Sequence, residues 1–274
     1  MFKINFLYWN VNNKNISLYI AEACIENEID VLILAEHKSI DISYLKRKLN
    51  ENSLHFEIEN IVPNSRILIL HKIKGNMKVI KESKFYSVFK LKDNDEEILV
   101  FALHLPSQYA QEKSDLNMYA SQIIREFQQI EEEYNNYKSI VVGDFNMNPF
   151  DEGMVSALGF NAVMCPNIAK KKSRKVLGKE YKFYYNPMWH IMGNDNNICK
   201  GTYYYPNSTK SYYWYTYDQI ILRPELINKF NIDKLSIITK TNGKSLVTKS
   251  NLPDKSKISD HLPIKFSIEM EEFK

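Results

Sequence analysis

The stretch KSIVVGDFNMNPF, residues 138–150, joins an apolar run to a polar turn. Residues 139–142 are apolar and β-branched, which predicts a buried strand, and Gly143 is expected to end it. Asp144 and Asn146 follow two residues apart, and on extended chain such residues point to the same side. A carboxylate and a carboxamide would then share one small volume. The alternative is a strand that ends in an ordinary Asx turn.

Other predicted strands also end in polar residues. Residues 3–9 and 30–35 are strand-like, and residues 98–103 form another apolar run. So many polar strand ends are hard to attribute to packing, and hard oxygen ligands such as Glu36 and Asp260 suit Mg²⁺ or Mn²⁺ better than zinc. The polar residues at or near these ends are Asn10, Asn12, Glu36, His104, Asp144, Asn146, Asp218, Asp260 and His261.

Composition places the chain among globular proteins. It has 274 residues, 44% of them hydrophobic and 13% aromatic, which is enough for a sizeable core. The net charge of +3 identifies no partner by itself. No apolar run approaches the ~20 residues of a membrane helix, and the first residues lack the pattern of a secretion signal. Three widely spaced cysteines favour a reducing cytoplasm, and frequent Lys, Asn and Ile are typical of an AT-rich, bacterial or phage genome.

The remaining periodicity predicts a mixture of helices and strands. We expect one domain over residues 1–274, because no repeat and no linker rich in Pro, Gly or Ser divides the chain. Helices are predicted at residues 16–27, 42–49 and 108–134, with another beginning near Glu152. Further strands are predicted at residues 55–61, 66–71, 77–80, 85–91, 217–222 and 235–239, with a last one after His261.

Residues 161–215 form the least regular stretch, an insertion rich in lysine and aromatic residues. Cations interleaved with aromatic rings are typical of grooves that hold single-stranded nucleic acid. Because the insertion precedes Asp218, we expect it near the catalytic face. The alternative is a solvated lysine loop with tyrosines packed on the sheet edge. The candidate substrate contacts are Lys171, Lys172, Arg174, Tyr184, Trp189 and Trp214, with Asn12 as a further one.

Six motifs in order, WNVNN, AEH, HLPS, GDFN, YDQIIL and SDHLP, resemble the endonuclease/exonuclease/phosphatase superfamily with the deoxyribonuclease I-like fold. The resemblance covers Trp9 to Pro263. It implies an α/β (α+β) protein built as a four-layer αββα sandwich, with two mixed or antiparallel β-sheets flanked by helices. The active site would lie at one edge of the sheets. The chain departs from the usual pattern at Ala35, where glutamine is common, and at Gln219, where tyrosine is common.

The resemblance also implies roles for matching residues. Glu36 would be the principal metal ligand, with Asn10 and Asp260 in or near the metal shell. Asp144 would orient or deprotonate the attacking water. The phosphate oxygens would be contacted by Asn146, His104 and His261, the last held by Asp218.

These roles predict a Mg²⁺-dependent (or Mn²⁺-dependent) phosphodiesterase, expected to be a nuclease that hydrolyses DNA or RNA. A phosphomonoesterase acting on a small substrate such as an inositol phosphate or a nucleotide is the alternative enzyme. A binding module with a decayed site is a weaker alternative, because every charged catalytic position is filled. We expect a nucleic-acid partner and no membrane partner, and the pattern leaves endo or exo cleavage open.

Overall fold

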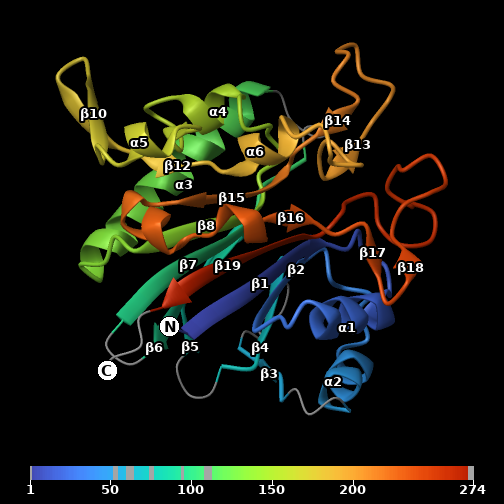
Figure 1. The fold of residues 1–274 in the computed structure, drawn as a ribbon. Coiled ribbons are helices and arrows are strands. Elements are labelled where there is room, and N and C mark those ends of the chain that lie inside the picture. Colours follow the sequence, from blue (N-terminus) through green and yellow to red (C-terminus); the bar gives the residue numbers. More distant parts are fainter. Residues whose placement is uncertain are drawn as a thin grey trace.

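A computed structural model describes residues 2–51, 55–59, 65–73, 77–93, 96–107 and 113–270. Two large β-sheets pack against each other, and helices lie on the outside of both (Figure 1). The predicted strand end at residues 60–61 and helix start at residues 108–112 fall outside the described residues.

The first sheet has six strands, and β1 lies near its centre. β1 pairs in parallel with β2 and antiparallel with β19, so the first and last strands of the chain are neighbours. In order across the sheet, the strands are β16 (Ser236–Ile237), β19 (Ile264–Met270), β1 (Phe2–Asn10), β2 (Val31–Ala35), β4 (Ile67–His71) and β3 (Glu57–Ile58).

The second sheet has seven strands and is also mixed. β7 and β8 are parallel, whereas β8 and β15 are antiparallel, with Asp144 directly opposite Asp218. That register brings the end of one strand beside the start of the other. In order, the strands are β5 (Met77–Glu82), β6 (Tyr86–Asp93), β7 (Glu96–His104), β8 (Ser139–Asp144), β15 (Asp218–Leu222), β12 (Tyr184–Tyr185) and β9 (Ala162–Val163).

Three apolar clusters define the layers. The central cluster joins the facing sides of the two sheets. A second cluster packs α1 (Ser17–Glu26) and α2 (Ile42–Asn50) on the first sheet, and a third packs α3 (Lys113–Glu133) and α4 (Glu152–Val155) on the second. The predicted four-layer αββα sandwich is therefore confirmed.

Alternation along β1 shows why both faces of a sheet are apolar. Ile4, Phe6 and Tyr8 belong to the cluster between the sheets. Leu7 and Trp9 belong to the cluster under the helices. Because successive strand residues point to opposite faces, one continuous apolar run covers both sides of the sheet.

The predicted end of the central strand was wrong, because β8 continues through Gly143 to Asp144. A Cβ atom on residue 143 would lie 1.9 Å from the carbonyl oxygen of Leu103 on the neighbouring strand. Glycine is therefore needed there for the close approach of two backbones, and it does not interrupt pairing.

The insertion adds two strands to one edge of the second sheet and forms two small sheets of its own. Its first part supplies β9, β12 and the projecting hairpin of β10 (Ser173–Val176) and β11 (Lys179–Lys182), and its last part supplies β13 (Tyr203–Tyr204) and β14 (Trp214–Tyr215). Figure 1 places β10 at one corner of the molecule and β13 and β14 at the other. The remaining short elements are α5 (Pro166–Ala169), α6 (Met188–Met192), η2 (Pro224–Lys229), η3 (Ile232–Lys234), β17 (Lys240–Thr241) and β18 (Lys244–Ser245).

A buried ion pair links the outer helix layer to β15. Arg223, directly after β15, donates from Nε and Nη2 to the two carboxylate oxygens of Glu131 on α3, at 2.8 and 2.7 Å. The side chains are only 1% and 0% exposed. Within the described chain, no helix combines the length and apolar character that crossing a membrane requires.

Candidate active site

Polar residues converge where β1, β2, β8 and β15 meet at one edge of the two sheets. A pocket of about 370 Å³ opens there. Its lining includes the polar side chains of Glu36, Asp144, Asn146, Asp260 and His261. The strand ends predicted from the sequence therefore contribute to one concave site.

Asp144 lies at the centre of this group and is fully buried. Its carboxylate accepts hydrogen bonds from Asn10 Nδ2 at 3.0 Å and from the backbone N–H of Asn146 at 2.8 Å. Its own N–H donates to the hydroxyl of Tyr8 at 2.9 Å, which ties β8 to β1. Burial raises the pKa of the Asp144 carboxyl and outweighs the opposing charge of His261.

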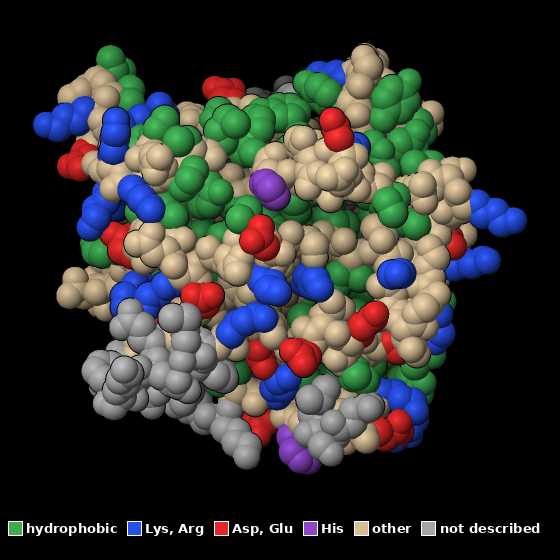
Figure 2. All heavy atoms as spheres, in the orientation of Figure 1, with side chains coloured by type: hydrophobic (Ala, Val, Ile, Leu, Met, Phe, Trp, Pro, Cys, Tyr) green, Lys and Arg blue, Asp and Glu red, His purple; other side chains and the backbone are tan. Residues whose placement is uncertain are grey.

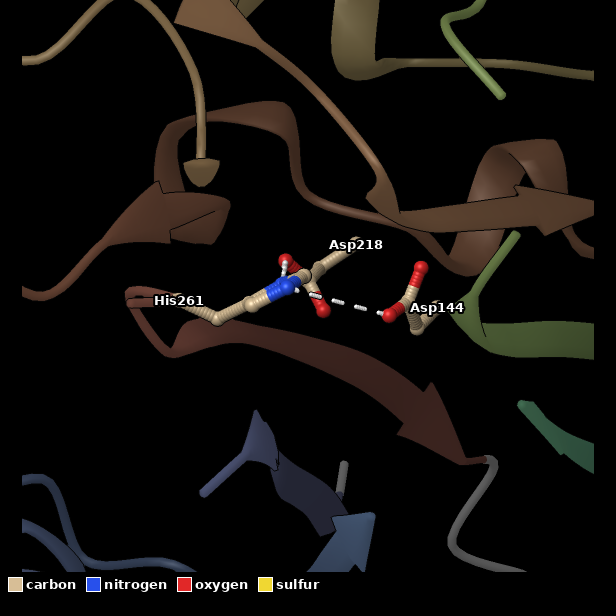
Figure 3. A group of neighbouring side chains, drawn as sticks. All are labelled: Asp144, Asp218 and His261. Carbon is tan, nitrogen blue, oxygen red and sulfur yellow. Dashed lines mark hydrogen bonds and ion pairs between the residues drawn. The ribbon is translucent and has the colours of Figure 1, made fainter. Parts of the chain in front are cut away.

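His261 and Asp218 form a buried pair beside Asp144. His261 Nδ1 lies 2.8 Å from Asp218 Oδ2, and His261 Nε2 lies 3.9 Å from Asp144 Oδ2. Figure 3 shows the imidazole between the two carboxylates. Burial disfavours the protonated ring, but the charge and hydrogen bond of Asp218 raise the pKa of His261 to about 10. The imidazole is therefore a cation near neutral pH, with Nε2 directed at Asp144.

Two residues absent from the predicted set hold this pair in place. Thr202 accepts from the N–H of Asp218 through its hydroxyl at 3.2 Å, and from the N–H of Leu262 through its carbonyl at 2.8 Å. Trp9 Nε1 donates to the carbonyl of His261 at 2.9 Å. Neither Thr202 nor Trp9 is a polar residue directly after a predicted strand, so the pattern used to find the site residues did not indicate them.

Glu36 adopts a left-handed backbone conformation, with φ +50°, directly after β2. Its Oε1 accepts from Asn10 Nδ2 at 3.3 Å and lies 3.4 Å from His104 Nε2. Its Oε2 accepts from Asn13 Nδ2 at 3.2 Å, a contact that the sequence analysis missed. Positive φ is uncommon outside glycine, so the surrounding contacts must hold this carboxylate against a local backbone preference.

His104, at the end of β7, faces Glu36 and Asp144 in the structure. Its Nε2 lies 3.9 Å from Asp144 Oδ2. Burial lowers the pKa of His104, and nearby Arg66 lowers it further, while Asp144 opposes both. His104 and His261 therefore differ in charge near neutral pH: the first is neutral and the second is protonated.

The geometry expected at Asn146 was wrong. Asn146 has φ +50°, so the chain turns and is not extended at this residue. The two side chains share the pocket because the N–H of Asn146 folds back onto Asp144, while Asn146 Nδ2 donates to the carbonyl of Leu105 at 3.0 Å. Asn12 likewise has φ +48°, and its N–H donates to Asn10 Oδ1. Both sites use Asx turns, the alternative reading of the sequence.

The group has the chemistry to hold a cation. Ligand atoms of Asp144, Asp218 and His261 lie within 4.8 Å of one another. Among the described residues, Asp218 Oδ1 and Asp260 Oδ1 are buried oxygens with no hydrogen-bond partner. Unpartnered buried carboxylate oxygens are costly without a compensating positive charge, so the carboxylates of this group fit a divalent ion, whereas the protonated His261 does not.

Solved structures of several proteins match the fold of this chain along nearly its whole length. TDP2 from D. rerio, complexed with single-strand DNA product, matches with 15% identity, 98% coverage of this chain, 99% of that chain and a TM-score of 0.57. An AP endonuclease from Archaeoglobus fulgidus matches with 15% identity, 97% and 100% coverage and a TM-score of 0.57. An endonuclease/exonuclease/phosphatase family protein from Bacteroides thetaiotaomicron matches with 14% identity, 99% and 99% coverage and a TM-score of 0.55.

The chain has the deoxyribonuclease I-like fold. A scan against protein-family models found no match, and a search of curated proteins found none either. At identities of 14–15%, the likeness establishes the fold, as the six motifs predicted, and the chemistry must be argued from the residues.

A tyrosine wall is part of the pocket lining. We use that name for Tyr203, Tyr205, Tyr215 and Tyr217, which line the pocket together with the carboxylates. The Tyr203 ring lies 4.8 Å from the His261 ring and 5.5 Å from the Tyr217 ring, measured between centroids. The last part of the insertion therefore reaches the site as expected, although none of these four tyrosines was among the predicted contacts.

Four predicted substrate contacts lie elsewhere in the fold. Tyr184 is 0% exposed and packs under the guanidinium of Arg223, so no base can stack on it. The cations flank or belong to the projecting hairpin, where Figure 2 shows Lys and Arg side chains at the corner that Figure 1 assigns to β10. Their partners there are remote from the pocket: Lys172 pairs with Glu225, and Arg174 donates to the carbonyl of Val155, while Lys171 precedes them in the same segment.

The two predicted tryptophans lie nearer to the tyrosine wall without lining the pocket. Trp214 is half-buried, and its ring lies 5.3 Å from that of Tyr204. Trp189 is half-buried against Phe150, whose ring is 5.5 Å from that of Tyr212. Their ring contacts support the pair of strands β13 and β14, which carries Tyr203 and Tyr215 of the tyrosine wall.

Proposed function

We propose that this protein is a metal-dependent phosphodiesterase that hydrolyses nucleic acid. The observation that carries the proposal is one pocket shared by Glu36, Asp144, Asn146, Asp260 and His261. Phosphoryl transfer needs a positioned water, a base and positive charge on the phosphate oxygens, and this set offers all three once a cation is bound.

The resident cation is proposed to be Mg²⁺ or Mn²⁺, held by Glu36 and Asp260 with Asn10 beside them. His261 is less suited to be a ligand, because Nδ1 is engaged by Asp218 at hydrogen-bond distance and the ring is protonated near neutral pH. Asp260 retains an unpartnered oxygen, and Glu36 faces the same pocket. When bound, a divalent ion would stabilise the charge of the phosphate and favour ionisation of a coordinated water.

Asp144 is proposed as the group that orients and deprotonates the attacking water. Its buried position raises its pKa, which makes the carboxylate a better proton acceptor. Asn10 and the N–H of Asn146 fix its direction through their two hydrogen bonds. The base is therefore held rigid before the substrate arrives.

His261 is proposed to donate from Nε2 to a phosphate oxygen. Asp218 fixes the ring through Nδ1 and keeps it protonated, so Nε2–H remains available on the pocket side. Asn146 lines the same pocket and is proposed to contact the phosphate through its carboxamide. His104 is proposed to contribute a neutral N–H donor beside Glu36.

The tyrosine wall favours nucleic acid as the substrate. Aromatic side chains bind bases by stacking, which tolerates any sequence. Two proteins of similar fold support this choice: TDP2 from D. rerio, solved with single-strand DNA product, and a 3′ phosphatase from Neisseria, solved with a product DNA hairpin. That second protein is named a 3′ phosphatase, so a phosphomonoesterase remains the alternative activity.

Cleavage of a mixed substrate panel tests the proposal. We would offer single- and double-stranded DNA, RNA and small phosphomonoesters with Mg²⁺ or Mn²⁺, with EDTA and Asp144→Ala as controls. Cleavage of a polymer, lost in both controls, is the expected result, and the product ends distinguish endo from exo action. Turnover of phosphomonoesters alone would establish the alternative, and no turnover of any substrate would overturn both.

We further propose that residues 1–274 act as one domain located in the cytoplasm. The central cluster draws on strands from both halves of the chain, which supports a single unit. Cys24, Cys165 and Cys199 are free thiols, as suits a reducing compartment. Fractionation of the producing cells would check the location.

A further inference from the structure

A second pocket, of about 500 Å³, adjoins the first. The two pockets share Glu36 and Ser107, and otherwise have different linings. The lining of the second pocket includes Lys38, Arg66 and Lys84. We call these three residues the cation cluster.

The charges of the two pockets are opposite. The first pocket has three carboxylates in its lining and no Lys or Arg, whereas the second has three Lys or Arg side chains and one carboxylate, Glu36. Among the described residues, no acidic side chain forms an ion pair with a member of the cation cluster. The cluster therefore does not serve to neutralise the catalytic carboxylates, and its charge is available to a ligand.

Packing limits the freedom of two of these cations. The guanidinium of Arg66 and the ammonium of Lys84 each lie 5.2 Å from the centre of the Phe85 ring. Cations placed over an aromatic face are attracted to it, so both side chains are directed toward the same small region. Preorganised donors lose less freedom when an anion binds.

The positions of the cluster follow from the fold. Arg66 directly precedes β4, Lys84 lies in the turn between β5 and β6, and Lys38 follows Glu36 by two residues. His104 lines the same pocket, and its Nε2 lies 3.4 Å from Oε1 of Glu36, so the pocket of the cluster extends to the proposed metal ligand. An anion bound by the cluster would be adjacent to the reaction centre and separate from it.

We propose that Lys38, Arg66 and Lys84 bind a phosphate group of the substrate other than the one that is hydrolysed. The inference rests on the proposed function and specifies its substrate: a strand with at least two phosphates that crosses Glu36, with an unpaired base against the tyrosine wall. Arginine and lysine are the usual donors to phosphate, and a polynucleotide supplies a phosphate at every linkage. A small monoester would leave the cluster unused.

Neutral linkages in the substrate test this inference. Single-stranded DNA octamers, each with one uncharged methylphosphonate at a different linkage, would be bound to the Asp144→Asn variant, and Kd measured by fluorescence anisotropy. We expect one linkage on one side of the scissile bond to weaken binding about 10-fold or more, the scale of a hydrogen bond between charged groups.

The profile, which is the dependence of Kd on the position of the neutral linkage, is then measured again in two further variants, one with Arg66→Gln and one with Lys84→Gln, each added to Asp144→Asn. Because each variant lacks a side chain that binds this phosphate, the loss of affinity caused by the neutral linkage should shrink to about 2-fold or less. The slope of log Kd against log salt concentration should fall by about 0.7 for each lost contact. Lys84 is exposed, so its variant guards against misfolding of the Arg66 variant. Arg47→Gln on the outer helix α2 is the matched control and should leave the profile unchanged.

The outcomes separate the inference from the proposed function. A flat profile, or a profile that both variants leave unchanged, would overturn the inference even if the wild type cleaves polymers. Octamers that neither bind nor are cut would overturn the inference for single-stranded DNA, while cleavage of RNA or double-stranded DNA in the substrate panel would still uphold the proposed function.

Discussion

Removing the charge of Glu131 should destabilise the fold strongly. Arg223 is 1% exposed, and its Nε and Nη2 atoms donate to Glu131 while Nη1 donates to the carbonyl of Phe183 at 3.1 Å. Glu131 also accepts from the hydroxyls of Ser139 and Tyr184. Glu131→Gln keeps the shape of the side chain but leaves a buried guanidinium without its counter-charge. Breaking a buried pair in this way costs about 3–5 kcal/mol.

Thermal unfolding followed by circular dichroism would measure the loss. One kcal/mol shifts Tm by roughly 2–4 °C in a chain of this size, so Tm should fall by about 6–20 °C. The double variant Glu131→Leu with Arg223→Met removes both charges and should recover most of the loss, because no unpaired charge remains. A single variant within about 1 kcal/mol of the wild type, or a double variant less stable than the single one, would refute the electrostatic explanation.

Three further predictions follow from the same structure. Gly143→Ala should destabilise the protein by about 3 kcal/mol or more, since the added Cβ would overlap the carbonyl of Leu103. In Gly178→Ala the added Cβ meets no atom within 4 Å, so only the positive φ of residue 178 should cost about 1–2 kcal/mol. Urea unfolding of both variants would measure the difference. His261→Ala should lower the cleavage rate roughly 10²–10⁴-fold with an unchanged circular dichroism spectrum, and a near-wild-type rate would remove His261 from the mechanism. Glutamine in place of the cations at the hairpin, Lys171, Lys172 and Arg174, should change the cleavage rate and KM by less than about 2-fold. A larger rise in KM would show that these residues contact the substrate.

Apolar periodicity predicted many of the individual strands and helices because it encodes burial directly, whereas the four-layer arrangement was implied by the family resemblance. Continuous apolar runs such as Val31–Ala35 became strands covered on both faces. The polar residues that follow such runs were gathered at one edge, since strand ends of a sheet share an edge. The placement of polar residues directly after apolar runs therefore predicted that Glu36 and Asp144 lie at one edge of the sheets, although the sequence gives no distance between them.

Periodicity could not predict which aromatic residues would face the pocket. Tyr184 and Tyr203 both belong to aromatic runs, yet one fills the core under Arg223 and the other lies against His261. The difference depends on strand pairing, since Tyr184 belongs to β12 in the large sheet and Tyr203 bridges to His261 outside it. Such pairing is tertiary information that a short segment does not contain.

Likewise, the cation cluster is invisible in the linear chain. Lys38, Arg66 and Lys84 come from three separate turns, and each looks like an ordinary solvated residue in its own surroundings. The basic run at residues 170–182 is far more conspicuous, but it leads into the hairpin that begins with β10, and Figure 1 places β10 at a different corner from β13 and β14, whose Tyr203 and Tyr215 line the pocket. Charge density along a sequence was therefore a poor guide to charge density around the pocket.

The hydrogen bond from Trp9 to His261 joins the two ends of the chain across 252 residues. During synthesis, Trp9 leaves the ribosome long before His261 exists, so the nascent chain carries the carboxylates of Glu36 and Asp144 without the imidazole that completes the site. Catalytic competence would arrive only with the last strand. Under the proposed function, a nascent chain therefore cannot hydrolyse its substrate before the segment that carries His261 has left the ribosome and folded.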